Sequence, residues 1–179
     1  MANNTTVSES GSVTMMHRKK QIYGLLDGTI IMTLAGEKAI QDIASGDRVI
    51  TRDSGMAVVK AIRMRTVTVD TVTIKAGSLG HTRPDRDVTV PADQEIFIRD
   101  WRAEAMFDSK QAMIPASRLV DGEFVTLTRD VEMTVYEIEF DGQHVIYADG
   151  IEVSSFIDQQ KMSAVPPKAT RPHTHMSKK

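Results

Sequence analysis

Two short runs of β-branched and apolar residues, each set between glycine turns, constrain the fold of this chain more than any other feature. The first lies in residues 24–33 (Gly-Leu-Leu-Asp-Gly-Thr-Ile-Ile-Met-Thr), and the second in residues 40–51 (Ile-Gln-Asp-Ile-Ala-Ser-Gly-Asp-Arg-Val-Ile-Thr). Runs of roughly four to eight such residues between Gly, Asp and Ser are typical of β-strands joined by tight turns. The pattern continues through most of the chain and indicates an all-β domain.

The strands follow from this pattern, and we expect them at residues 30–34, 48–52, 58–69 (one long strand or a pair), 72–74, 88–98 (two strands around a turn at residues 91–95), 124–128, 135–140 and 145–148. The apolar positions slip by one residue between Val69 and Val72. Such a slip exchanges the two faces of a sheet and therefore predicts a turn or bulge near Asp70.

The segments between the strands carry weaker patterns. Residues 37–43 and 113–120 are predicted to form short helical turns, the second with Pro115 near its start. Residues 101–111 are polar, and we expect them to be irregular. Asp141 and Gly142 form a dipeptide typical of tight hairpins, so we expect the last two strands to pair.

The strand pattern stops near both ends of the chain. Residues 1–20 are rich in Asn, Thr and Ser, and residues 158–179 contain several prolines without apolar periodicity. Such segments bury too little apolar surface to offset the entropy of ordering. We therefore expect one domain at residues 21–157 between two flexible tails.

The composition excludes several classes of function. Lys and Arg total 22 against 24 Asp and Glu, so we expect no binding of nucleic acid. The sequence has no cysteine, which excludes disulfides and thiol chemistry. It also lacks an apolar signal sequence and any run of about 18 apolar residues, so we expect no membrane partner. The compartment stays open between the cytoplasm and export without a cleaved N-terminal signal.

Metal and cofactor motifs are missing as well. The sequence contains no phosphate-binding loop, no Gly-x-Ser-x-Gly elbow and no His-Glu-x-x-His pair. His173 and His175 have no cysteine or further ligands beside them, and Asp85, Asp87 and Asp93 are not framed by a calcium-loop motif. We expect neither a metal ion nor a cofactor.

Three separated segments resemble the Hint domain, the fold shared by hedgehog autoprocessing modules and inteins. Residues 24–51 are similar to the opening of that family, in which a Cys is followed by Gly-Thr, a strand and Gly-Asp-x-Val. Residues 76–87 (Ala-Gly-Ser-Leu-Gly-His-Thr-Arg-Pro-Asp-Arg-Asp) resemble the signature of a bacterial branch, and residues 135–155 resemble the last intein blocks. The resemblance covers about residues 22–157. It implies a horseshoe-like β-disk of two similar halves whose ends lie close together.

The resemblance also implies which residues occupy the reacting positions. Family members start with a Cys or Ser that attacks the preceding carbonyl, helped by a group that protonates the leaving nitrogen. Here Gly24 replaces the nucleophile, and Gln94, which cannot shuttle a proton near neutral pH, replaces a histidine. The terminal His-Asn pair is replaced by Ser154 and Ser155, neither of which can form a succinimide. His144 alone keeps its identity, and its apolar neighbours on a strand are typical of a structural, hydrogen-bonded histidine.

These positions predict a Hint domain without autoprocessing, and so without enzyme activity, that acts as a structural or protein-interaction module. The loop at residues 76–87 is its predicted contact surface, where His81, Arg83 and Asp87 would line a binding site. Ion pairs and backbone bonds within the loop are the other explanation of these side chains.

Two further functions remain open from the sequence. One is an active self-cleaving domain with a non-standard nucleophile, for which Thr29 and Ser155 are the nearest hydroxyls. The other is an unrelated small β-barrel binding domain.

Overall fold

The computed structural model describes residues 21–156, in which twelve strands, one α-helix and two 3-10 helices form. The predicted tails at residues 1–20 and 158–179 lie outside the described residues, and the domain boundaries stay a prediction. Between these limits the chain is mostly β-sheet, as the sequence predicts.

The strands form two antiparallel sheets. The smaller has the order β1-β10-β6-β7, with bounds β1 Leu25–Leu26, β10 Val125–Glu139, β6 Ala61–Ile74 and β7 Val88–Pro91. The larger has the order β3-β2-β4-β11-β12-β8-β9, with β5 beside β4. Its bounds are β2 Ile30–Thr33, β3 Gly36–Ala39, β4 Arg48–Thr51, β5 Gly55–Val58, β8 Glu95–Ile98, β9 Ala112–Pro115, β11 Val145–Ala148 and β12 Ile151–Ser154.

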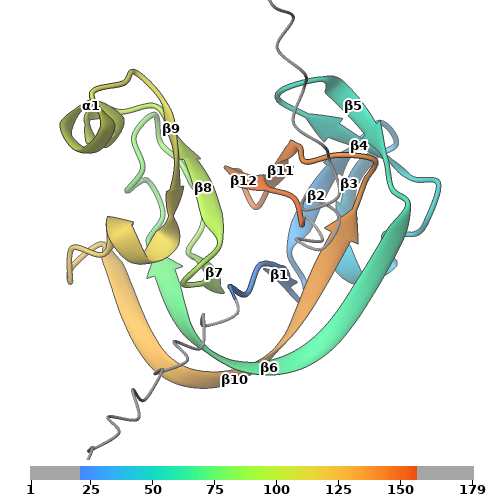
Figure 1. Cartoon of the computed structure of the whole chain (residues 1–179), viewed down its shortest axis with the longest axis horizontal. Helices are drawn as coiled ribbons and strands as arrows, with labels where there is room; N and C mark the ends of the chain where they lie inside the picture. The colour runs from blue at the N-terminus through green and yellow to red at the C-terminus, as the bar shows by residue number, and fades with distance from the viewer. Residues whose placement is uncertain (1–20, 157–179) are drawn as a thin grey trace, which may run out of the picture.

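The two sheets together make a horseshoe (Figure 1). The long strands β6 and β10 curve round its base, one arm carries β7, β8, β9 and the helix α1, and the other carries β2 to β5. The hairpin of β11 and β12 lies between the arms. It joins them because Val153 of β12 pairs with Ile96 in one arm, while Ile146 of β11 pairs with Thr51 in the other.

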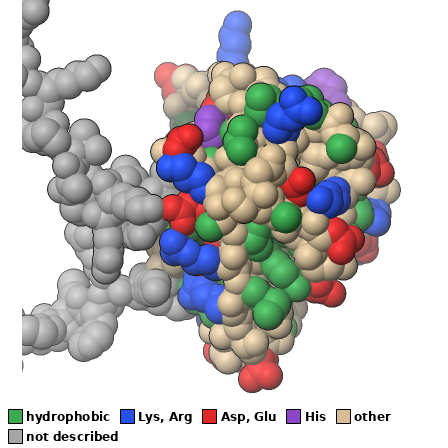
Figure 2. Space-filling model, turned by 90° about the vertical axis from the view of Figure 1, so that its right-hand side faces the viewer, with side chains coloured by type: hydrophobic (Ala, Val, Ile, Leu, Met, Phe, Trp, Pro, Cys, Tyr) green, Lys and Arg blue, Asp and Glu red, His purple; other side chains and the backbone are tan. Residues whose placement is uncertain are grey.

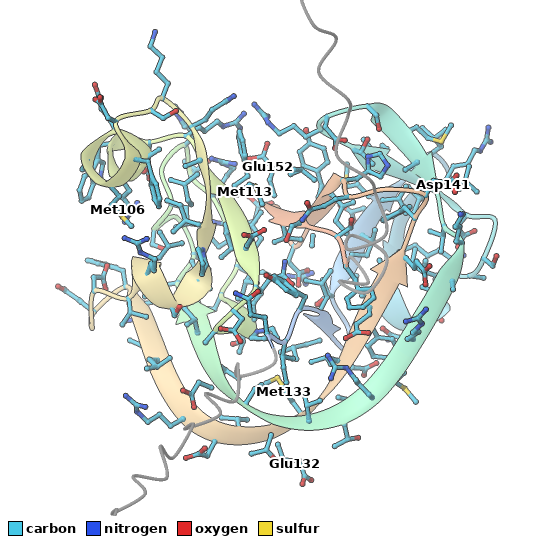
Figure 3. The ribbon with its side chains drawn as sticks, viewed as in Figure 1. Met106, Met113, Glu132, Met133, Asp141 and Glu152 are labelled. Atoms are coloured by element: carbon cyan, nitrogen blue, oxygen red, sulfur yellow. The ribbon has the colours of Figure 1, made fainter. Side chains whose placement is uncertain are left out.

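A β-bulge in β10 lies next to the bend. Arg129 and Asp130 together oppose the single residue Asp70 of β6, and the N–H of Asp130 donates to Asp70 Oδ1 at 3.1 Å. Just beyond the bulge, Glu132 points away from the horseshoe and Met133 points into it (Figure 3). The predicted irregularity near Asp70 therefore exists, but the extra residue belongs to β10. The segments predicted at residues 58–69 and 72–74 form one continuous strand β6 from residue 61 onward, while Val58 ends β5.

Alternate residues of the strands supply the core. Ile96 of β8 and Ile114 of β9 are fully buried and directly opposite each other, and Val90 of β7 is 1% exposed. Full burial of one such side chain contributes roughly 1.5–3 kcal/mol. The core thus anchors β7 and β8 on both sides of the turn that carries Gln94.

Helix α1, Trp101–Phe107, forms where the sequence predicted an irregular segment. Asp100 caps it by accepting a hydrogen bond from the backbone N–H of Arg102 at 2.9 Å, and Ala103 is fully buried. The prediction was wrong because a helix of seven residues is too short to show an apolar repeat.

Both predicted helical turns are partly strands. Residues 112–115 pair with β8 as β9, and only Ala116–Leu119 after Pro115 form a 3-10 helix. Residues 36–39 likewise form β3 before a 3-10 helix at Ile40–Asp42. Burial against a neighbouring strand outweighs the local helical preference of these residues.

The predicted hairpin at Asp141 and Gly142 is wrong, because β10 and β11 belong to different sheets and the chain crosses between them there. The hairpin instead joins β11 to β12 through Asp149 and Gly150, whose φ angles of 47° and 77° suit a two-residue turn. Residues 124–128 and 135–140, predicted as separate strands, fall largely within the single strand β10.

The outer surface of the β2–β4–β5 arm is partly apolar. Met32, Leu34, Met56 and Val58 are exposed there around Arg48, which pairs with Val58 across the strands. Figure 2 faces this arm and shows hydrophobic side chains interspersed with charged ones. Within residues 21–156, no helix has the length and apolar character needed to cross a membrane.

Candidate functional site

The predicted reacting positions meet at the centre of the horseshoe. Gly24 precedes β1, Gln94 ends the turn between β7 and β8, and Ser154 ends β12. The Gly24 N–H donates to Gln94 Oε1 at 3.0 Å, and Gln94 Nε2 donates to the Ser154 carbonyl at 2.9 Å. One glutamine side chain therefore links the N-terminal and C-terminal segments of the site.

Gln94 is held in one orientation. It is 1% exposed, its oxygen faces a backbone donor, and its nitrogen faces the carbonyls of Glu95 and Ser154 as well as the Ser154 hydroxyl. Exchanging the amide oxygen and nitrogen would break these bonds. Gln94 therefore accepts a hydrogen bond from the Gly24 nitrogen, whereas cleavage requires a group that gives a proton to that nitrogen.

Gly24 has a backbone suited to glycine. Its φ is 143°, and a Cβ built on it would lie 3.0 Å from Val135 Cβ and 3.1 Å from the Tyr136 carbonyl oxygen. Contacts this short require Val135 and Tyr136 to move by a few tenths of an ångström. A nucleophilic side chain at this position would therefore be strained by this φ and crowded by β10.

Two hydrogen bonds between Ser155 and the backbone of His144 close the C-terminal part of the site. The Ser155 N–H donates to the His144 carbonyl at 2.8 Å, and the His144 N–H donates to Ser155 Oγ at 3.0 Å. Ser154 and Ser155 are both buried. The space that Ser154, Ser155, Gly24 and Gln94 help to line measures about 10 Å³, which is at the limit for one water molecule.

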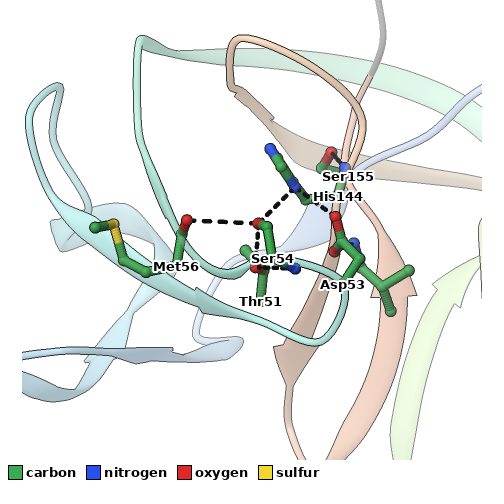
Figure 4. Close-up of polar contacts among 7 residues, drawn as sticks. Thr51, Asp53, Ser54, Met56, His144 and Ser155 are labelled. Atoms are coloured by element: carbon green, nitrogen blue, oxygen red, sulfur yellow. Dashed lines mark hydrogen bonds and ion pairs between the residues drawn. The ribbon is translucent and has the colours of Figure 1, made fainter.

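His144 points its ring toward the turn after β4 (Figure 4). Its Nδ1 lies 2.7 Å from Asp53 Oδ2 and 3.2 Å from Ser54 Oγ, and its ring packs edge-on against Phe140. Its bonds with Ser155 run through the backbone N–H and carbonyl. The imidazole thus links the segment before β11 to the turn after β4, as expected for a structural, hydrogen-bonded histidine.

Asp53 was missed as a site residue because the sequence shows it only as part of a turn, 91 positions from His144. Burial on its own raises the pKa of its carboxyl. Hydrogen bonds from the Val145 N–H and from His144 outweigh that effect, and the pKa of Asp53 lies below its usual value. The carboxylate is therefore the stable form of Asp53 beside the imidazole.

Glu137 is buried beside the same small space. Arg65 Nε donates to its Oε1 at 2.8 Å. The Glu137 carboxylate is therefore already engaged in an ion pair in the folded domain.

The loop at residues 76–87 folds back on the domain. Asp87 Oδ1 accepts from the Ala76 N–H at 2.9 Å, and Arg83 forms an ion pair with the buried Glu152. His81 is exposed at a φ of 51°. Two of the three predicted binding residues thus make internal contacts, and a binding role for the three stays a prediction.

The acidic residues weighed as metal ligands have other contacts. Asp93 Oδ2 accepts from the Ile22 N–H at 3.2 Å, and Asp85 packs against Gly150. Across the part of the chain that the structure describes, no three His, Asp or Glu side chains gather closely enough to hold a metal ion. His173 and His175 lie outside that part.

A family model described as the Hint domain matches residues 23–160. The chain belongs to the Hint domain family. This membership confirms the predicted family and fold, and it rules out an unrelated β-barrel. No curated protein gives a significant match.

Solved structures are similar to this Hint domain at low sequence identity. A bacterial intein-like domain from Clostridium thermocellum shares 19% identity with a TM-score of 0.53, covering 75% of this chain and 98% of its own. The gp41-1 intein shares 16% identity with a TM-score of 0.47, covering 73% of this chain and 96% of its own. The MchDnaB-1 intein shares 14% identity with a TM-score of 0.49, covering 74% of this chain and 99% of its own.

Proposed function

We propose that this Hint domain has lost autoprocessing and acts as a structural or protein-interaction module. The observation that carries the proposal is Gly24, which has no side chain, adopts a φ of 143° and donates its N–H to a buried acceptor. Loss of a single acid or base slows such a reaction by about 10²–10⁴. Loss of the nucleophile removes the reaction itself.

The C-terminal residues support the same proposal. Cleavage at this end of an intein requires an asparagine side chain that cyclises, and Ser154 and Ser155 carry hydroxyls instead. Both hydroxyls are bonded within the fold, Ser154 Oγ to Gln94 and Ser155 Oγ to the backbone of His144.

An interaction role is supported by four apolar side chains, Met32, Leu34, Met56 and Val58, which are exposed around Arg48 on the β2–β4–β5 arm. Exposed apolar side chains that gather on one face of a folded domain favour contact with another protein. We propose that a protein partner, and neither nucleic acid nor a membrane, covers such a surface.

The alternative is self-cleavage through an unusual hydroxyl. Thr29 is buried, and the whole of β1 lies between it and the Tyr23–Gly24 bond. Ser155 Oγ already accepts a hydrogen bond from the His144 N–H. The His144 ring contacts Asp53 and Ser54 through Nδ1 and is not bonded to either hydroxyl through that atom.

The intact mass of the purified full-length chain decides between these functions. It should be measured after prolonged incubation with and without dithiothreitol and hydroxylamine. We expect a single unprocessed mass. A product that ends at Tyr23 or Ser155 would show that the chemistry persists.

A double substitution tests the reason for the loss. Gly24→Cys with Gln94→His restores the side-chain types that the family uses, but the φ of Gly24 disfavours any side chain there. A folded double variant that stays intact would show that the backbone must change as well. Cleavage would show that the two side chains alone are decisive.

A further inference from the structure

Three arginines surround one buried carboxylate between the two arms of the horseshoe. Glu152 of β12 is 2% exposed, and Figure 3 shows it in the region between the arms. Arg52 Nη1 donates to its Oε1 at 2.8 Å, and Arg83 Nη1 donates to its Oε2. Arg99 Nη1 lies 3.7 Å from Oε1. These four residues, the Glu152 cluster, come from four separate segments, so the cluster exists only in the folded domain.

The Glu152 cluster carries more positive than negative charge. Its three guanidinium groups face one carboxylate, which leaves an excess of two positive charges. By contrast, the buried Glu137 forms its ion pair with the single arginine Arg65. Because these side chains are partly shielded from water, the excess charge attracts an anion more strongly than exposed arginines do.

Several donors of the cluster are unused within the described residues. The Nε of Arg83 is buried without a hydrogen-bond partner there, and Arg99 is too far from Glu152 for a hydrogen bond. Arg52 is fixed by the Phe97 ring, which lies 4.3 Å from its guanidinium carbon. The cluster is therefore a preformed set of donors from both arms.

We propose that the Glu152 cluster binds an oxyanion through Arg52, Arg83 and Arg99. Guanidinium groups match the paired oxygens of carboxylates and phosphates, and such charge-assisted bonds are among the strongest hydrogen bonds in proteins. The oxyanion comes from a free phosphate or from an acidic side chain of a peptide. In this proposal Arg83 acts together with Arg52 and Arg99, whereas a binding role for His81 and Asp87 stays a prediction.

This inference does not depend on the loss of autoprocessing. The cluster shares no residue with Gly24, Gln94, His144 and Ser155, so binding and self-cleavage are measured independently.

The full-length chain should be titrated with sodium phosphate and with a hexaglutamate peptide, both followed by calorimetry and by thermal unfolding. Sodium chloride at the same ionic strength controls for screening. We expect at least one of the two oxyanions to bind and to raise Tm above the chloride control, because a ligand that binds only the folded state stabilises it. Tighter binding of the peptide would identify an acidic partner, and tighter binding of phosphate would identify a free oxyanion.

Arg99→Gln tests the site without breaking a hydrogen bond to Glu152. We expect it to weaken oxyanion binding at least about tenfold, since it removes one charge-assisted contact. Arg118→Gln is the matched control, because Arg118 stacks on Phe107 and is not part of the cluster. Equal responses to the oxyanions and to chloride, or equal weakening in the two variants, would overturn the proposal.

Discussion

Gly24 allows β1 to lie close to β10, where Leu25 pairs with Tyr136. The absence of a Cβ leaves room for the side chain of Val135 and the carbonyl of Tyr136, which a Cβ at this position would meet at 3.0 Å and 3.1 Å. The residue therefore has a packing role that is independent of any reaction.

Gly24→Ala is expected to lower the free energy of unfolding by about 1–3 kcal/mol, because a side chain is strained at this φ and collides with β10. Urea unfolding of the variant measures the change. Gly142→Ala is the control, since a Cβ added there would meet no atom within 4 Å and its φ is not positive, and we expect a change below about 0.5 kcal/mol. Equal losses in both variants would contradict this account.

The sequence could predict which residues stand at the reacting positions, but not how they bond. The order of the three motifs is sufficient to bring Gly24, Gln94 and Ser155 into one region. The direction of the Gln94 hydrogen bonds and the pairing of Asp53 with His144 depend on side chains far apart in the chain, which leave no local pattern.

At the level of single elements, the long strands were harder to predict than the short ones. A bulge interrupts the alternation of apolar residues just as a turn does, so the sequence pattern divides β10 into two strands. In β6 the slip between Val69 and Val72 divides the pattern in the same way, although the strand itself is continuous. The short strands β2, β4 and β11 have uninterrupted patterns and lie close to their predicted positions.

The bulge gives a prediction at Asp130, whose φ is 52°. Asp130→Val is expected to lower the free energy of unfolding by about 1–3 kcal/mol, because β-branched residues strongly disfavour this conformation. Asp130→Gly, which removes the same carboxylate, is expected to be nearly neutral because glycine adopts this conformation readily. Chemical denaturation compares the two. If both variants lost the same stability, the side chain and not the backbone would be responsible.

At the level of the whole molecule, the sheets are made by pairings that no local pattern encodes. The crossing at Asp141 and Gly142 looks like a hairpin in the sequence, yet β11 pairs with β12, β4 and β2. The resemblance to the Hint family predicted the horseshoe of two halves, but not the pairing of β11 with β12 in place of β10.

Stability of the whole domain in acid depends on carboxylates that the fold holds ionised. The pKa of Asp47 is lowered by its hydrogen bonds with Lys38 and the Ala44 N–H. The pKa of Asp121 is lowered by the backbone N–H groups of residues 125, 123 and 124, which outweigh the opposing effect of burial. The pKa of Asp53 is lowered as well, by the hydrogen bonds described above.

When the pKa of a carboxyl is lower in the folded than in the unfolded state, its ionised form stabilises the fold at pH values above the unfolded pKa, which is about 4 for aspartate. This stabilisation is lost as the pH falls through the folded pKa. We therefore expect the free energy of unfolding to decrease as the pH falls below about 4. Urea unfolding from pH 7 to about pH 2.5 measures it. Asp121→Asn should flatten the decrease, because it removes a carboxylate that the fold holds ionised. A decrease of the same steepness in both proteins would exclude Asp121 as a source.

The two hydrogen bonds of Gln94, to Gly24 and to Ser154, hold the two ends of the domain next to each other. Because one side chain joins residue 24 to residue 154, two proteins fused before and after the domain would begin at neighbouring points. Short linkers would then keep the fused partners at a high effective concentration relative to each other. With the proposed loss of cleavage, the Gln94 hydrogen bonds would couple the two fused proteins permanently.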